Sequence, residues 1–163
     1  MTKQMDRLWA PWRINYIRKS NEKGCIFCRA RKSSREKYVL FKTRYSMAVL
    51  NIYPYNNGHS MVAPLRHVGD IARLKDEEAL DLMRSLNKLK RMLDKALKAH
   101  GYNIGININR SAGAGVVGHL HVHIVPRWKG DTNFISTVYD TKIISQSLDE
   151  LFRLLKDAEA KTD

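Results

Sequence analysis

The segment HLHVHIVPR, residues 119–127, constrains this chain more than any other, because three histidines alternate with three aliphatic residues. Such alternation predicts a half-buried strand with its imidazoles on one face and its aliphatic side chains on the other. Successive imidazoles would then stand about 7 Å apart. Aligned histidines can bind a transition metal, or they can supply a nucleophile and a general acid near neutral pH.

The segments around this run predict an α+β fold with a mostly antiparallel, five-stranded sheet and helices on one face. Leucines at three- and four-residue steps predict a long helix over 76–100, with Asp76 as N-cap and Gly101 as the C-terminal stop. A second amphipathic helix is expected over 148–155 at the C-terminal end. We expect residues 1–20 to form a basic aromatic arm and residues 21–163 a single domain. The expected strands are 38–41, 46–51, 59–64, 104–109 and 119–127.

The chain of 163 residues is strongly basic, with 29 Lys and Arg against 16 Asp and Glu and a net charge of +13. Nucleotides, polyphosphates and nucleic acid are all plausible anionic partners, although many of these charges could simply solvate helix faces. No nucleic-acid-binding motif is recognisable, so we do not expect nucleic acid as a partner. An apolar run of about 18 residues is absent, as is a signal peptide, so we expect a cytoplasmic protein without a membrane partner.

A glycine-rich segment, SAGAGVVG at residues 111–118, directly precedes the histidine run. Glycines alone could mark a tight turn. Beside a possible nucleophile, however, a loop that exposes backbone N–H groups favours an anion site.

The only two cysteines, Cys25 and Cys28, form a CxxC pair. Their spacing suits half of a zinc site or a redox pair, although two unrelated thiols are also consistent with it.

The HxHxHxx pattern of residues 119–125 resembles the signature of the histidine triad (HIT) superfamily of nucleotide hydrolases and transferases. The likeness extends over NIYPYNNGH at 51–59, PLRH at 64–67 and the segment 107–126. The opening LWAPWR at 8–13 and the tail PRWKGDTNF at 126–134 resemble the branch that acts on dinucleoside polyphosphates, which includes bacterial phosphorylases and fragile-histidine-triad-like hydrolases.

This resemblance implies a catalytic role for three histidines. His121 would be the nucleophile that attacks the α-phosphorus, His123 would hydrogen-bond the α-phosphate, and His59 would sit behind His121 and orient it. Asn51 would contact the ribose. The phosphate would be held by Asn109 and by the backbone of the glycine-rich loop at Gly115, Val116, Val117 and Gly118.

The same resemblance implies a structural zinc ion and a homodimer. Cys25 and Cys28 would be joined by His67 and His119, a closed tetrahedral set that leaves no open catalytic position. The long helix and neighbouring strands would form the dimer interface.

One position departs from the family pattern and bears on the reaction. Many HIT hydrolases carry glutamine four residues before the first triad histidine, where this chain has Gly115. We therefore expect a nucleotidyl transferase that uses phosphate as acceptor, a phosphorylase of diadenosine polyphosphates such as Ap4A. The alternatives are a hydrolase of dinucleoside polyphosphates or adenosine phosphoramidates, a nucleotide-binding module without turnover, and a protein that binds metal on all three strand histidines.

Overall fold

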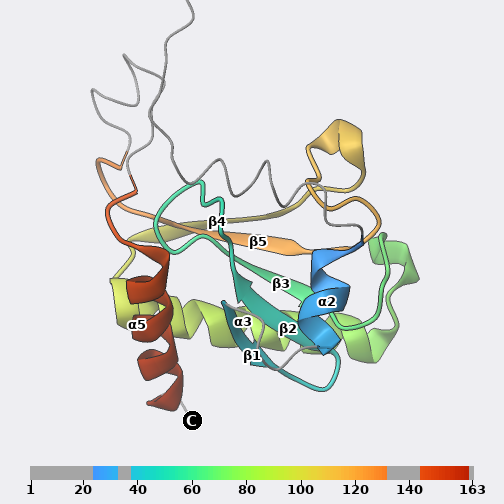
Figure 1. Ribbon diagram of the computed structural model, residues 1–163, viewed down its shortest axis with the longest axis horizontal. Helices are drawn as coiled ribbons and strands as arrows, with labels where there is room; N and C mark the ends of the chain where they lie inside the picture. The colour runs from blue at the N-terminus through green and yellow to red at the C-terminus, as the bar shows by residue number, and fades with distance from the viewer. Residues whose placement is uncertain (1–23, 33–37, 132–143, 162–163) are drawn as a thin grey trace, which may run out of the picture.

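The computed structural model describes residues 24–32, 38–131 and 144–161, and within them five strands form one antiparallel sheet in the order β1-β2-β3-β5-β4 (Figure 1). The predicted arm at residues 1–20 lies outside the described residues. The α+β fold and the five-stranded antiparallel sheet are confirmed. The strands are β1 (Val39–Lys42), β2 (Ser46–Leu50), β3 (Ser60–Pro64), β4 (Gly101–Ile106) and β5 (Val122–Arg127).

Two helices cover one face of the sheet and enclose the main core. The long helix α3 (Asp76–Leu97) lies against β2, β3 and β5, and α5 (Leu148–Ala160) packs against α3 and β1. The predicted leucine stripe of α3 is buried here, since Leu86, Leu89 and Leu93 belong to this core. Each fully buried side chain of this size contributes about 1.5–3 kcal/mol relative to exposure.

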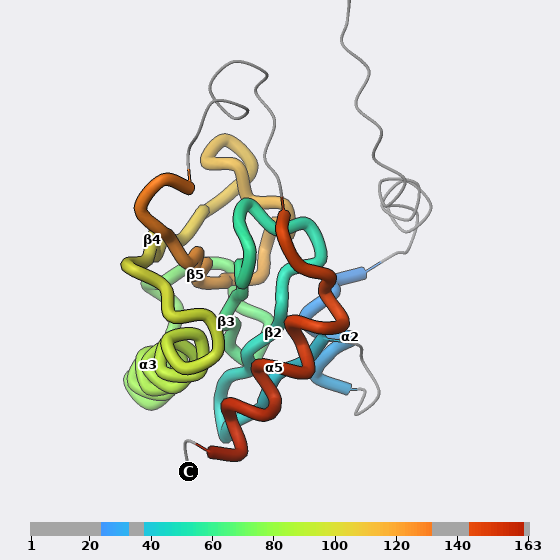
Figure 2. Tube along the Cα trace, turned by 90° about the vertical axis from the view of Figure 1, so that its left-hand side faces the viewer, coloured from blue at the N-terminus to red at the C-terminus, as the bar shows by residue number. Residues whose placement is uncertain are grey.

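A shorter helix, α2 (Ile26–Lys32), lies on the opposite face of the sheet, so the expectation of helices on one face holds for α3 and α5 only (Figure 2). Its Phe27 and Ala30 are buried in a second, smaller core with Met47, Met61 and Ala63. Because side chains alternate along a strand, Met61 and its cross-strand partner His123 face this second core. The sheet therefore separates the main core from the face that carries the histidines.

The predicted ends of the long helix and the start of the following strand are wrong by a few residues. The N-cap is Lys75 rather than Asp76, and α3 ends at Leu97, followed by Lys98 in the left-handed conformation with φ 49°. Gly101 does not stop the helix but pairs with Arg127 at the start of β4. The pairing of residues 101–106 with β5 thus determines the conformation of Gly101, which the local sequence alone predicts to end the helix. No helix in the described part of the chain is long and apolar enough to cross a membrane.

The histidine strand also begins later than predicted, at Val122. His119 and His121 lie in the segment just before β5. The backbone N–H of Leu120 donates to the carbonyl of Val68 at 2.6 Å, so this segment is bonded to the loop after β3 instead of to a strand. The three imidazoles are therefore not equivalent members of one strand face.

Candidate active site and metal centre

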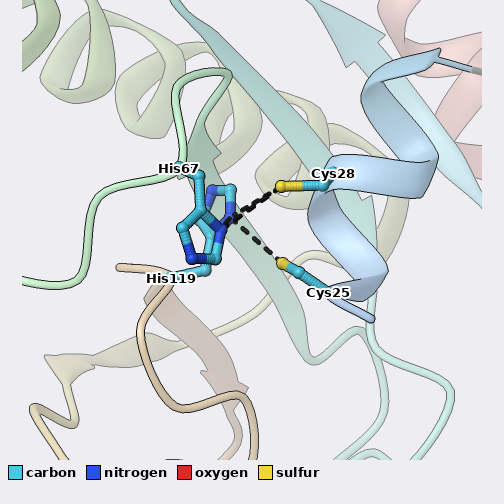
Figure 3. Close-up of side chains that lie close together, drawn as sticks. All are labelled: Cys25, Cys28, His67 and His119. Carbon is cyan, nitrogen blue, oxygen red and sulfur yellow. Dashed lines mark hydrogen bonds between the residues drawn. The ribbon is translucent and has the colours of Figure 1, made fainter. Parts of the chain in front are cut away.

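Four side chains that could hold a metal ion converge beside α2 from three separate segments (Figure 3). Cys25 immediately precedes α2 and Cys28 lies in its first turn, His67 comes from the loop after β3 and His119 from the segment before β5. Cys25 Sγ lies 3.1 Å from His119 Nδ1, and Cys28 Sγ lies 3.3 Å from His67 Nδ1. The two Nδ1 atoms are 3.2 Å apart, and all four ligand atoms lie within 4.8 Å of one another.

The chemistry and spacing of this group fit a zinc ion. A tetrahedral site with ordinary zinc bond lengths places neighbouring ligand atoms about 3.3–3.8 Å apart. Four of the six ligand pairs here are 3.1–3.7 Å apart, and all six lie within 4.8 Å. His119 Nε2 donates to the carbonyl of Pro64 at 2.8 Å, which leaves the Nδ1 lone pair facing the thiols. Such a hydrogen bond fixes the tautomer that a metal ligand requires.

An ion pair anchors the loop that carries His67. The Arg66 guanidinium donates to both carboxylate oxygens of Glu78 in α3, at 2.7 and 2.6 Å. These hydrogen bonds lower the pKa of Glu78 to about 2, so the carboxylate stays ionised. With the Leu120–Val68 backbone bond, the pair holds the segments of His67 and His119 against each other.

His121 is buried, with 2% of its surface exposed, and its ring is held by three neighbours. Its Nδ1–H donates to the carbonyl of His119 at 2.8 Å, an assignment that follows because a carbonyl can only accept. Nε2 is then left with its lone pair. The Phe27 ring lies 5.1 Å away and the His123 ring 4.8 Å away. A neutral imidazole with a free Nε2 is the form that can attack phosphorus.

A second hydrogen-bonded chain fixes the tautomer of His123. The backbone N–H of Tyr55 donates to His59 Nδ1 at 3.0 Å, so His59 carries its proton on Nε2. That Nε2–H donates to His123 Nδ1 at 2.9 Å, which leaves the His123 proton on Nε2, where it can be donated to a ligand. The prediction that His59 orients His121 is therefore wrong in its detail, because its hydrogen bond goes to His123.

Both members of this pair are neutral at physiological pH. Burial and the neighbouring imidazoles of His123 and His121 lower the pKa of His59 to about 3. Burial and the imidazole of His121 lower the pKa of His123 to about 4. Neutral imidazoles can donate and accept at defined atoms, as the chain from Tyr55 to His123 requires.

The turn before β3 places His59 and Asn51 together. Asn51 Nδ2 lies 3.2 Å from His59 Nδ1, and its Oδ1 accepts the backbone N–H of Tyr53 at 2.9 Å. Gly58 has φ +78°, and a Cβ there would meet Leu97 Cδ1 at 2.5 Å, so the residue before His59 has to be glycine. Asn51, predicted to contact a ribose, is thus adjacent to His59.

The glycine-rich loop, which directly precedes His119 in the sequence, has unpaired backbone donors. At its two ends the N–H groups of Ala114 and Leu120 donate to the carbonyls of Asn109 and Val68. Between them, within the described chain, the N–H groups of Gly115, Val116, Val117 and Gly118 have no intramolecular partner. A Cβ at Gly115 would meet no atom within 4 Å, so the space in front of this residue is open. The loop has the exposed donors of an anion site.

Sequence reasoning missed two aromatic residues at this site. Tyr55 stacks on His59 with ring centroids 4.5 Å apart, although 59% of its surface is exposed. Phe27 contacts the rings of both His119 and His121. The only local signals in the sequence are that Tyr55 lies four residues before His59 and that Phe27 lies between the two cysteines. Neither signal specifies a ring contact.

The chain belongs to the HIT family, because residues 32–130 match the family model for the HIT domain. It is 40% identical over 162 residues to the AP-4-A phosphorylase of Mycobacterium tuberculosis, an alignment that covers 93% of this chain and 83% of that protein. It is also 38% identical over 101 residues to the asymmetrical bis(5'-nucleosyl)-tetraphosphatase of Schizosaccharomyces pombe, covering 62% of this chain and 55% of the relative.

Solved structures agree with this assignment. A Zn-bound histidine triad family protein from Mycobacterium smegmatis matches with a TM-score of 0.70 and 27% identity, covering 84% of this chain and 94% of that one.

Proposed function

We propose that this HIT enzyme is a nucleotidyl transferase that cleaves diadenosine polyphosphates such as Ap4A by phosphorolysis, through a nucleotide bound covalently to His121. The observation that carries the proposal is the free Nε2 of His121, set by the hydrogen bond from Nδ1–H to the His119 carbonyl. The similarity to an AP-4-A phosphorylase over 93% of the chain supports the choice of substrate.

In the first step, His121 Nε2 attacks the α-phosphorus, the bond from that phosphorus to the bridging oxygen breaks, and ATP leaves. His123 Nε2–H donates to an oxygen of the attacked phosphate, and Asn109 and the free N–H groups of residues 115–118 hold the same phosphate. Donors fixed before the reaction stabilise the charge that develops on these oxygens. Asn51 contacts the ribose.

In the second step, an oxygen of inorganic phosphate attacks the same phosphorus, the phosphorus–nitrogen bond breaks, and ADP is released. The proton of the hydrogen phosphate passes to solvent, and His121 returns to its starting state. Two displacements divide one difficult reaction into two easier ones.

The open space at Gly115 favours phosphate as the acceptor, since no side chain fills the position where many HIT hydrolases carry glutamine. Hydrolysis by water is the second candidate function, supported by the similarity to an asymmetrical tetraphosphatase. The two candidates share the covalent step on His121 and differ only in what removes the nucleotide.

We propose that the four ligands Cys25, Cys28, His67 and His119 hold a structural zinc ion. A closed set of two thiolates and two imidazoles leaves no position for substrate, so the ion stabilises the fold around the site and takes no part in the reaction. Because the zinc ion does not bind His121 or His123, both imidazoles stay available for the proposed reaction.

We also propose a homodimer formed through the edge strand β4 and helix α3. Ile104 in β4 is 49% exposed, and Leu80 and Met83 are exposed on α3. An uncharged edge strand with an exposed apolar side chain is a surface on which a second strand can pair. Light scattering should give the mass of two chains, and Ile104→Lys should yield monomers. A wild-type protein that is monomeric at micromolar concentration would refute this interface.

The cytoplasmic location expected from the sequence stays a prediction.

Product analysis tests the proposed reaction. Purified protein is incubated with Ap4A in potassium phosphate, or in potassium sulfate of the same ionic strength, and the nucleotides are separated by chromatography. We expect ADP and ATP in phosphate and no turnover in sulfate. AMP and ATP in sulfate would instead establish the hydrolase, and no products in either buffer would favour a nucleotide-binding module.

A further inference from the structure

Phe27 is the only aromatic side chain in the CxxC segment, and it points into the protein. Only 1% of its surface is exposed. Its ring centroid lies 5.0 Å from that of His119 and 5.1 Å from that of His121, with interplanar angles of 46° and 36°. The side chain thus contacts one metal-ligand residue and the proposed nucleophile.

We propose that Phe27 is a positioning residue that holds the His121 ring in the orientation required for attack, and thereby couples the metal-binding helix to catalysis. This inference rests on the proposed function, in which His121 is the nucleophile. It assigns Phe27 a role beyond filling the small core on this face of the sheet.

The geometry around His121 shows why a third contact is needed. The hydrogen bond from Nδ1 to the His119 carbonyl fixes one ring atom, but the ring can still tilt about that bond. His123 meets the ring edge to face, at 4.8 Å and 71°. Phe27 adds a tilted ring contact that opposes movement of the imidazole plane. Small errors in the aim of a nucleophile lower rates strongly because the reacting atoms must be aligned.

The position of Phe27 itself depends on the metal centre. Cys25, just before α2, and Cys28, within it, flank Phe27 in the sequence, and both thiols lie against His119 Nδ1. Beyond these contacts, Arg31 donates to the carbonyl of Leu65 at 3.2 Å. A helix of seven residues is too short to be stable alone, so the thiol contacts help to decide where Phe27 lies.

The test compares Phe27→Leu with a matched core variant, Met47→Ala. Met47 is fully buried in the same small core, so its truncation removes packing there while Phe27 keeps its ring contacts with His119 and His121. We expect Phe27→Leu to lower kcat for Ap4A roughly tenfold, a barrier change of the size given by misaligned groups, with KM within about twofold of wild type and zinc content unchanged. Met47→Ala should lower Tm but keep kcat within about twofold. Phe27→Met, whose unbranched and flexible side chain adapts better to an irregular space, replaces Phe27→Leu if the latter fails to fold.

A spectroscopic measurement without substrate separates this inference from the proposed function. Long-range ¹H–¹⁵N correlations report the tautomer of His121, which we expect to be a single form protonated at Nδ1 in wild type and Met47→Ala. In Phe27→Leu the signals should broaden or show both tautomers. If Phe27→Leu matches Met47→Ala in both spectrum and kcat, the positioning role is refuted. If His121→Asn keeps full turnover while the spectra differ as expected, the proposed function fails and the ring contact stands.

Discussion

Replacing His121 with Asn is expected to lower kcat for Ap4A cleavage by roughly a thousandfold or more, as removal of a nucleophile does in enzymes with covalent intermediates. Asparagine has no nitrogen that can accept the nucleotide. Its amide can still donate to the His119 carbonyl, so the buried polar contact survives. Nucleotide affinity, measured by calorimetry, and the free energy of unfolding should therefore change little.

His100→Asn is the matched control, because His100 is exposed and its Nδ1 accepts the backbone N–H of Lys129, beyond the end of β5 farthest from His121. This variant should keep wild-type kcat. A His121→Asn protein whose kcat stays within about tenfold of wild type would rule out His121 as nucleophile.

The second large effect is expected from Cys25→Ser, which removes one of the four proposed zinc ligands. A hydroxyl is a poor substitute for a thiolate, so zinc should be lost on purification. If the wild-type site is filled at free zinc about a thousandfold above its Kd, losing it removes about 4 kcal/mol of stability. Elemental analysis and urea denaturation measure the two effects.

Zinc removal and return provide the control for Cys25→Ser. Wild-type protein stripped with a chelator should match the variant in stability and recover when zinc is added back, whereas the variant should not recover. Wild-type protein that purifies without about one equivalent of zinc, or a variant with unchanged metal content, would contradict the structural-zinc proposal.

The parts of the fold that the sequence predicted correctly depend on local periodicity. The leucine stripe of α3 reports which of its side chains face the core, and that core is observed. The α+β class and the five strands follow from this patterning. The observed ends of strands and helices differ from the predicted ones because they depend on pairings between distant residues. Gly101 with Arg127 and Leu120 with Val68 are two such pairings.

For the candidate site, the sequence predicted which residues belong to it better than it predicted which of them contact one another. Cys25 and His119 are 94 residues apart, and their expected proximity came from the family resemblance, not from spacing. The hydrogen bond of His59 to His123, and the contact of Phe27 with His121, depend on how the turn before β3 and helix α2 pack on the sheet. No local pattern in the sequence encodes such packing.

The proposed mechanism requires that His121 carries the nucleotide during turnover, and trapping the covalent adduct tests this most directly. Protein mixed with Ap4A in phosphate-free buffer and quenched within milliseconds can be analysed by intact and peptide mass spectrometry, with acid avoided to preserve the phosphorus–nitrogen bond. We expect a mass increase of one adenylyl group on the peptide that contains His121, which disappears when phosphate is added before the quench. An adduct on another residue, or rapid turnover with no adduct under any quench, would contradict it.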